Sequence, residues 1–254
     1  MKAFIAFTKK EFTESLRTYR LVILAAVFLL LGMLSPLLAK MMPEILKSVA
    51  DIGLVISMQE PAAMNSWEQF FSNVGQMGML ALIITFCGMM ANELSRGTLI
   101  NLLTKGMKRH TVILSKFLTA TVLWTGSYLL CLAVCYAYTE YFWPAAGLSN
   151  AFLAFFSLWL FGELLIAILI FGGVLFGNLY GSLLACLGVI ITLNVLHIMP
   201  AIQKYNPIIL SGDALNLLNA QKGTADYVPA MVICTAAAVL LMVASVAVFN
   251  KKRV

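Results

Sequence analysis

Glu163 has the clearest capacity for chemistry, because it is an ionisable side chain in the middle of the long apolar run 152–176. A carboxylate at the centre of a bilayer is energetically costly, so we expect Glu163 to face the bundle interior in a protonated, hydrogen-bonded or hydrated form. It is either a functional proton or cation site or a neutral group that ties helices together, and the sequence leaves both open. Asn194, in the run 181–199, is a candidate for a hydrogen bond between helices.

A second group of residues with functional potential lies in the stretch ANELSRGTLINLLTKGMKRHTVILSKF, residues 91–117. The pattern of residues 98–105 predicts a helix of one or two turns with Leu99, Leu102 and Leu103 on one side. Gly106 is expected to end this helix. Clustered leucines are unusual in a solvated loop, so we expect a short apolar helix presented to another protein. The alternative is that the leucines lie in the lipid interface. The basic residues that would anchor the stretch at lipid headgroups are Arg96, Lys105 and Arg109.

The sequence lacks motifs for enzymatic chemistry. No G-x-x-x-x-G-K-[ST] loop is present to cradle nucleotide phosphates, and neither H-E-x-x-H nor G-x-S-x-G occurs. His110 and His197 are predicted on opposite sides of a membrane, and the five Cys lie in apolar runs without metal-type pairing. We therefore expect no catalytic residue, no metal and no cofactor in this chain, and no nucleic-acid partner.

Hydropathy identifies the elements that must position these residues. Charged residues make up only 11% of the 254 residues, well below the roughly 25% of a soluble protein. Continuous apolar runs fit the about 20 residues that a helix needs to cross a bilayer. They span 21–39, 67–91, 112–138, 152–176, 181–199 and 227–249. We predict an all-α polytopic membrane protein with six transmembrane helices, in which Gly177-Asn-Leu-Tyr-Gly181 forms a tight turn.

The distribution of Lys and Arg predicts the orientation of these helices. Basic residues gather in the N-terminal segment, in the 93–116 connection and in the C-terminal tail. Cytoplasmic flanks of membrane helices collect such residues. We therefore expect a multi-pass protein of a bacterial cell membrane, with both termini and the 93–116 connection on the cytoplasmic side.

The N-terminal segment reads as an amphipathic helix. Ile5, Phe12, Leu16 and Tyr19 lie on one helical face, with polar residues off it. A basic helix of this kind is expected along the inner membrane surface. The predicted organisation is one membrane domain over 1–254. It comprises an interface helix at 1–20 that includes Arg17 and Arg20, a six-helix bundle at 21–249 and a cytoplasmic tail at 250–254.

The 93–116 connection resembles the cytoplasmic stretch after the second helix in ATP-binding-cassette type-2 exporter permeases. In that family the stretch runs E-x-x-x-G-T-hydrophobic, a leucine pair, a basic turn and a Lys before the third helix. The N-terminal Phe7-Thr-Lys-Lys-Glu-Phe12 and Arg17-Thr-Tyr-Arg20 are similar to the family's interface helix. A proline common near the basic turn is replaced here by Met107 or Lys108. The positions that match the stretch are Glu93, Gly97, Thr98, Leu102, Leu103, Arg109 and Lys116.

The resemblance implies a half-transporter with two permease chains, identical or different, and two separate ATPase subunits that bind ATP and Mg²⁺. Residues 97–105 would form the coupling helix, and 200–227 would form an outer re-entrant region. A cavity lined by the second and fifth spans would hold the substrate. The second span contains Met77, Met79, Met89 and Met90, which favour an amphipathic peptide, lipid or drug. We also predict that Glu93 pairs with Arg17 or Arg20.

Two other classes of function stay open from the sequence. An ion-coupled secondary transporter or channel could use Glu163 as its proton or cation site. A membrane scaffold without transport could use the same docking helix. Neither alternative requires a separate ATPase.

Overall fold

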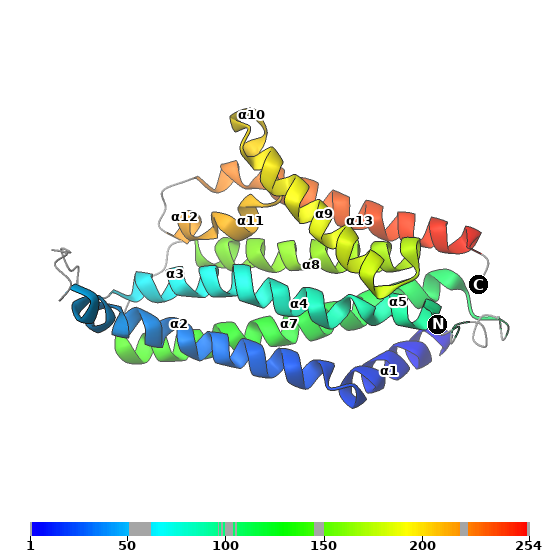
Figure 1. Cartoon of the computed structure of the whole chain (residues 1–254), viewed down its shortest axis with the longest axis horizontal. Coiled ribbons are helices and arrows are strands. Elements are labelled where there is room, and N and C mark those ends of the chain that lie inside the picture. Colours follow the sequence, from blue (N-terminus) through cyan, green and yellow to red (C-terminus); the bar gives the residue numbers. More distant parts are fainter. Residues whose placement is uncertain are drawn as a thin grey trace.

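The computed structural model describes residues 2–50, 62–95, 97, 99, 104, 106–144, 150–218 and 223–252, and in this part of the chain the regular secondary structure is all helical. The long helices run roughly side by side along the molecule (Figure 1). The longer elements are α1 (Lys2–Arg17), α2 (Arg20–Ala50), α3 (Ala63–Asn73), α4 (Met79–Phe86), α5 (Gly88–Ser95), α7 (Arg109–Phe142), α8 (Ala151–Phe176), α9 (Leu179–His197) and α13 (Val228–Lys251). Shorter elements are a π-helix (Val74–Gly78), α10 (Pro200–Gln203), α11 (Ile209–Gly212), α12 (Ala214–Leu218) and a 3-10 turn (Thr224–Asp226).

Six helical segments are long and apolar enough to cross a membrane, as predicted. The second of these segments is built from α3, the π-helix, α4 and α5 in succession. The segments are Arg20–Met42, Ala63–Ser95, Arg109–Phe142, Ala151–Phe176, Leu179–His197 and Thr224–Lys251.

The predicted turn between the fourth and fifth spans is confirmed. Gly177 ends α8 with a φ of 70°, a left-handed conformation that favours glycine. The Asn178 side chain then accepts a hydrogen bond of 2.6 Å from the Gly181 N–H and caps α9. The chain therefore reverses here within a few residues, and six crossings result.

Helix α8 is the centre of the fold. It packs against α13, α9, α5 and α7, and against the short helices α11 and α12. Its buried residues lie all round the helix from Leu158 to Val174, as expected for an apolar helix inside a bundle. At Gly162 a Cβ atom would lie 2.5 Å from the Trp124 ring, so glycine is what allows α7 to approach α8 here.

The segment between α9 and α13 folds back onto the bundle. Leu210, Ala214 and Leu217 are fully buried, and α11 and α12 contact α8 and α3. The Tyr227 hydroxyl donates a 2.9 Å hydrogen bond to the Asp213 carbonyl and joins the start of α13 to this segment. This arrangement agrees with the re-entrant region that the resemblance implies for 200–227.

The two ends of the bundle differ in what they carry. Both termini lie at one end, together with the end of α5 and the start of α7, whereas α10 lies far from them (Figure 1). We call the end that carries both termini the terminal end. The end of α5 and the start of α7 thus lie at the same end of the molecule as α1 and the last residues of α13, as six crossings require.

Candidate functional site

A cluster of five charged side chains, three of them buried, occupies the terminal end of the bundle. The Lys116 ammonium lies 2.9 Å from a Glu11 carboxylate oxygen and 2.8 Å from a Glu93 carboxylate oxygen. The Lys10 ammonium lies 3.0 Å from Glu11, 2.7 Å from Glu14 and 2.6 Å from Glu93. We call these five residues the charge cluster.

Three separate helices supply the charge cluster. Helix α1 contributes Lys10, Glu11 and Glu14, α5 contributes Glu93 close to its end, and α7 contributes Lys116. Lys116 is only 1% exposed and Glu11 only 2%. Because α5 and α7 flank the stretch predicted to couple to an ATPase, the charge cluster ties both ends of that stretch to α1.

The surroundings of Lys10 favour its charged form. Partial burial of Lys10 lowers its pKa, but hydrogen bonds to Glu14 and Glu93 and the charges of Glu11 and Glu93 outweigh burial, so the net pKa of Lys10 is raised. Its side chain is 43% exposed, so solvent screens these interactions in part. Lys116 has no such screening, and its ion pairs are fully desolvated.

The carboxylates of Glu11, Glu14 and Glu93 lie close enough together to bind a metal ion. The Lys10 ammonium lies within salt-bridge distance of all three. Lysine therefore supplies the positive charge that a metal ion would otherwise supply. The arrangement is suited to holding helices together.

The predicted pairing of Glu93 with Arg17 or Arg20 was wrong. Lys10 and Lys116 form its salt bridges in the described part of the chain, whereas Arg17 and Arg20 do not. Arg17 is the last residue of α1 and Arg20 is the first residue of α2. Both therefore lie beyond the turn of α1 that faces Glu93. The expectation that Glu93 is bound to the N-terminal helix is correct, but through a residue two turns earlier.

The predicted apolar face of α1 lies on the outside of the bundle. Ile5, Phe12, Leu16 and Tyr19 are all exposed, whereas Phe7, Glu11 and Ser15 on the other side are buried against the protein. The outward face has the composition expected for contact with lipid. Its position at a membrane surface stays a prediction.

Residues 97–105, which the resemblance predicts to form a coupling helix and which we call the coupling stretch, are described only in part. Gly97 and Gly106 have φ values of 64° and 85°, so both adopt the left-handed conformation that favours glycine. Leu99 is fully buried in the chain's own core, which is at odds with the prediction that it faces another protein. The other predicted contact residues lie outside the described residues: Arg96, Thr98, Leu102, Leu103 and Lys105.

Arg109 has a clear structural role at the start of α7. Its guanidinium donates hydrogen bonds to the carbonyl oxygens of Phe249 and Lys252, the latter at 2.6 Å, and lies over the Phe249 ring. The Lys252 ammonium in turn donates to the carbonyl of Val174 at 2.8 Å, near the end of α8. Positive groups thus satisfy the last carbonyls of two helices. Arg109 joins α13 to the coupling stretch.

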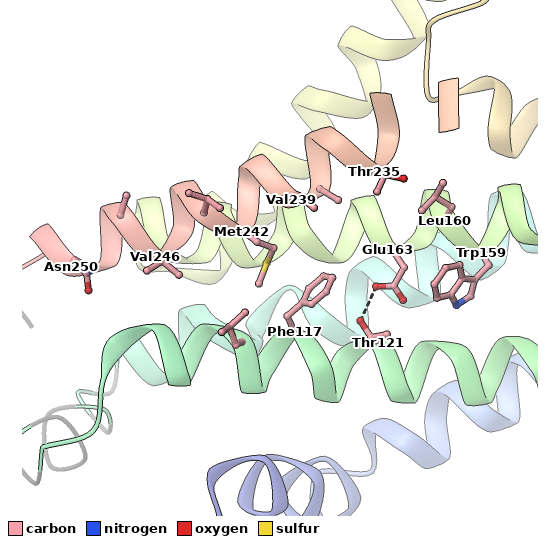
Figure 2. Close-up of a pocket in the computed structure, with 14 residues that line it drawn as sticks. Phe117, Thr121, Trp159, Leu160, Glu163, Thr235, Val239, Met242, Val246 and Asn250 are labelled. Carbon is pink, nitrogen blue, oxygen red and sulfur yellow. Dashed lines mark hydrogen bonds between the residues drawn. The ribbon is translucent and has the colours of Figure 1, made fainter. Parts of the chain in front are cut away.

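Glu163 lies in a groove between α7, α8 and α13, as Figure 2 shows. One carboxylate oxygen accepts a hydrogen bond of 2.7 Å from the Thr121 hydroxyl. The other is buried and has no hydrogen-bond partner among the described residues. The groove has a volume of about 770 Å³. The prediction that Glu163 faces the interior is therefore confirmed, and its neighbour Thr121 was not anticipated.

Other predicted polar and methionine positions have different surroundings from those expected. Asn194 is exposed and donates to the Ile190 carbonyl of its own helix at 2.8 Å, so among the described residues it joins no other helix. A helix backbone acceptor one turn away competes with partners on other helices. Met79, Met89 and Met90 are buried in the core.

Residues 5–254 match the model of a family described as "ABC-2 family transporter protein". Among curated proteins, the chain is similar to the "Uncharacterized transmembrane protein YxlG" of Bacillus subtilis (strain 168), at 26% identity over 163 residues. That alignment covers 63% of this chain and 63% of the relative. The family match includes the charge cluster, the groove and nearly the whole chain.

Proposed function

Because the chain belongs to the family of ABC-2 transporter membrane proteins, we propose that it is the transmembrane subunit of an ATP-driven exporter. A separate ATPase subunit binds ATP and Mg²⁺, and a second permease chain, identical or different, completes the transporter. The chain acts as one membrane domain over 1–254, with interface helix 1–20, bundle 21–249 and tail 250–254. The terminal end faces the cytoplasm in the cell membrane, in agreement with the gathering of Lys and Arg there.

The charge cluster is the observation that supports this function most strongly. A passive bundle needs no desolvated ion pairs, because apolar side chains of similar volume pack equally well or better. Removing one charged partner is costly, however, so α1, α5 and α7 are held as a unit. Such a unit is what a transporter needs at the point where force from another subunit enters.

The proposed mechanism follows the order of contacts along the terminal end. Closure of the ATPase on ATP pushes the stretch 97–105, with Leu102 and Leu103 as the contact residues. Glu93 and Lys116 pass the displacement to α1 and α7. Arg109 passes it to α13 through the Phe249 and Lys252 carbonyls. The two permease chains then change the side of the membrane from which their common cavity is reached.

A hydrophobic or amphipathic substrate suits the surfaces of this chain. Exposed large apolar side chains are spread over α4, α9 and α13, among them Ile84, Leu184 and Val239. Met77 is 62% exposed near the middle of the second span, which the resemblance assigns to the cavity, and offers an adaptable apolar contact. This position supports export of a peptide, drug or lipid.

Glu163 keeps one alternative function open. A buried carboxyl in a membrane helix is typical of proton and cation pathways, and an ion-coupled carrier would use it without an ATPase. The charge cluster favours the exporter, because an ion-coupled carrier has no need of a stiffened docking stretch.

Purification of the tagged full-length chain from its own membrane distinguishes these functions. We expect an ATPase with a phosphate-binding loop to co-purify, and expect Leu102→Asp together with Leu103→Asp to abolish the association. The control is Ala201→Asp together with Gln203→Asp, which places the same charges on exposed positions of α10, outside the candidate spans and far from the terminal end. A chain that purifies alone and transports in sealed vesicles without ATP would contradict the proposal.

A further inference from the structure

The Glu163 carboxyl is incompletely satisfied inside its groove. Glu163 is only 5% exposed, and Thr121 is its hydrogen-bond donor. The second carboxyl oxygen has no partner in the part of the chain that the structure describes. Leaving a buried acceptor without a partner is energetically unfavourable. This oxygen is therefore available to a ligand that can donate a hydrogen bond.

The walls of the groove are apolar. Leu160 of α8, Phe117 of α7 and Met242 of α13 line it, and Figure 2 shows them around the carboxyl. Residues of α13 line it at intervals of three and four from Thr235 to Asn250, which is one helical face. No Lys or Arg occurs among the described residues that line the groove. A cation in it would have no competitor for Glu163.

The groove can be reached from the side of the bundle. Leu114 of α7 and Val239 and Val243 of α13 line it and are 46%, 57% and 62% exposed. These residues belong to helices that span the membrane, so molecules dissolved in the lipid reach the groove directly. Its volume of about 770 Å³ suits a molecule the size of a drug or a single acyl chain.

The depth of Glu163 restricts what kind of molecule can bind. Glu163 is 13 residues from Phe176 at the end of α8, which corresponds to about 20 Å along the helix. A lipid headgroup stays at the membrane surface and does not reach this depth. The occupant must instead carry its own polar group into the apolar region, on an apolar body.

We propose that this groove is a binding site for a hydrophobic amine, whose nitrogen pairs with Glu163 while its apolar body contacts α7, α8 and α13. Without a ligand the carboxyl is expected to be neutral at this depth. An amine that arrives from the lipid in its neutral form accepts the proton from Glu163, which forms an ammonium and a carboxylate with no change in net charge. The site goes beyond the proposed function, since it requires no ATPase.

The test uses the purified full-length chain in nanodiscs of a zwitterionic lipid. The probe is a dodecyl chain with a dansyl group at one end and a primary amine at the other, compared with the same molecule ending in a hydroxyl. Binding is measured by energy transfer from tryptophan to dansyl, because Trp159 lines the groove. We expect wild type to bind the amine at least about tenfold more tightly than the alcohol.

Three variants make the result specific. Glu163→Gln, which preserves the shape of the side chain, should reduce the preference for the amine to about onefold. Glu68→Gln makes the same change on an exposed residue of α3 and should leave the preference intact. Val239→Phe should weaken binding of both probes by filling the groove, and it adds no tryptophan donor. The inference is overturned if wild type shows no preference, if Glu163→Gln retains it, or if Val239→Phe affects neither probe.

This experiment is separate from the test of the exporter. No ATPase is present, so loss of the amine preference leaves the proposed function standing. Failure of an ATPase to co-purify would likewise leave the groove and its ligand unaffected.

Discussion

Lys116 is the residue on which the charge cluster depends most. Its ammonium is shared between Glu11 of α1 and Glu93 of α5, and all three side chains are buried. Removal of the lysine would leave these two buried carboxylates with Lys10 as their counter-charge, which is 43% exposed and also pairs with Glu14. Loss of one partner from a buried ion pair costs about 3–5 kcal/mol, far more than the pair's net contribution to stability.

We therefore predict that Lys116→Met lowers the unfolding free energy by about 3–5 kcal/mol. The measurement is denaturation of the purified chain in detergent, followed by circular dichroism. Adding Glu11→Gln to this variant should restore part of the loss, because one orphan charge is then removed.

An exposed salt bridge provides the control for this prediction. Lys204 and Asp226 are about half exposed and 3.3 Å apart. Lys204→Met should change the unfolding free energy by less than about 1 kcal/mol. Equal effects of Lys116→Met and Lys204→Met would show that the buried cluster does not stabilise the bundle.

The sequence contained part of the signal for the charge cluster. Lys116 falls inside the apolar run 112–138, and such a lysine requires an acidic partner. Which acid lies there could not be read from the sequence, because Glu11 is more than a hundred residues away. Helical periodicity placed Glu11 off the apolar face of α1, and the buried side of α1 proved to be the charged one. Glu163, by contrast, was predictable from its run alone.

At the scale of elements, two glycines frame the coupling stretch. Gly97 follows α5, and Gly106 precedes α7, both with positive φ. A side chain at Gly106 would meet no atom within 4 Å, so only the backbone conformation selects glycine there. The entry of the stretch into α7 therefore depends on a left-handed residue.

We predict that Gly106→Ala destabilises the chain by about 1–2 kcal/mol, because an L side chain strains the left-handed conformation. Gly126, inside α7, also has open space around it but has no positive φ. Gly126→Ala should therefore stabilise the chain by about 0.5–1 kcal/mol. Thermal unfolding of both variants in the same detergent measures the difference. Stabilisation by both would exclude a strained turn at Gly106.

Elements were more predictable than the contacts between them. The six spans and the turn at Gly177 follow from hydropathy and glycine, which are local properties. The burial of Leu99 and the outward position of Asn194 were missed, because each depends on which helices pack beside it. Periodicity identifies an apolar face but does not tell whether protein or lipid covers it.

At the scale of the whole molecule, the fold separates two sites along the bundle. The charge cluster and Arg109 lie at the terminal end, whereas Glu163 lies near the middle of α8. Helix α7 is common to both, since it carries Arg109, Lys116 and Thr121. Movement of the first turns of α7 would therefore shift Thr121 and change the shape of the groove.

We propose that the terminal end contacts an ATPase, and site-specific photo-cross-linking tests this contact most directly. A photoreactive amino acid is placed at Leu103 and, in a separate chain, at Ile198, which is 76% exposed after the end of α9. We expect that illumination of cells forms a covalent adduct between the residue at position 103 and an ATPase with a phosphate-binding loop. The residue at position 198 should form no such adduct. An adduct from Ile198 alone, or none from Leu103, would contradict it.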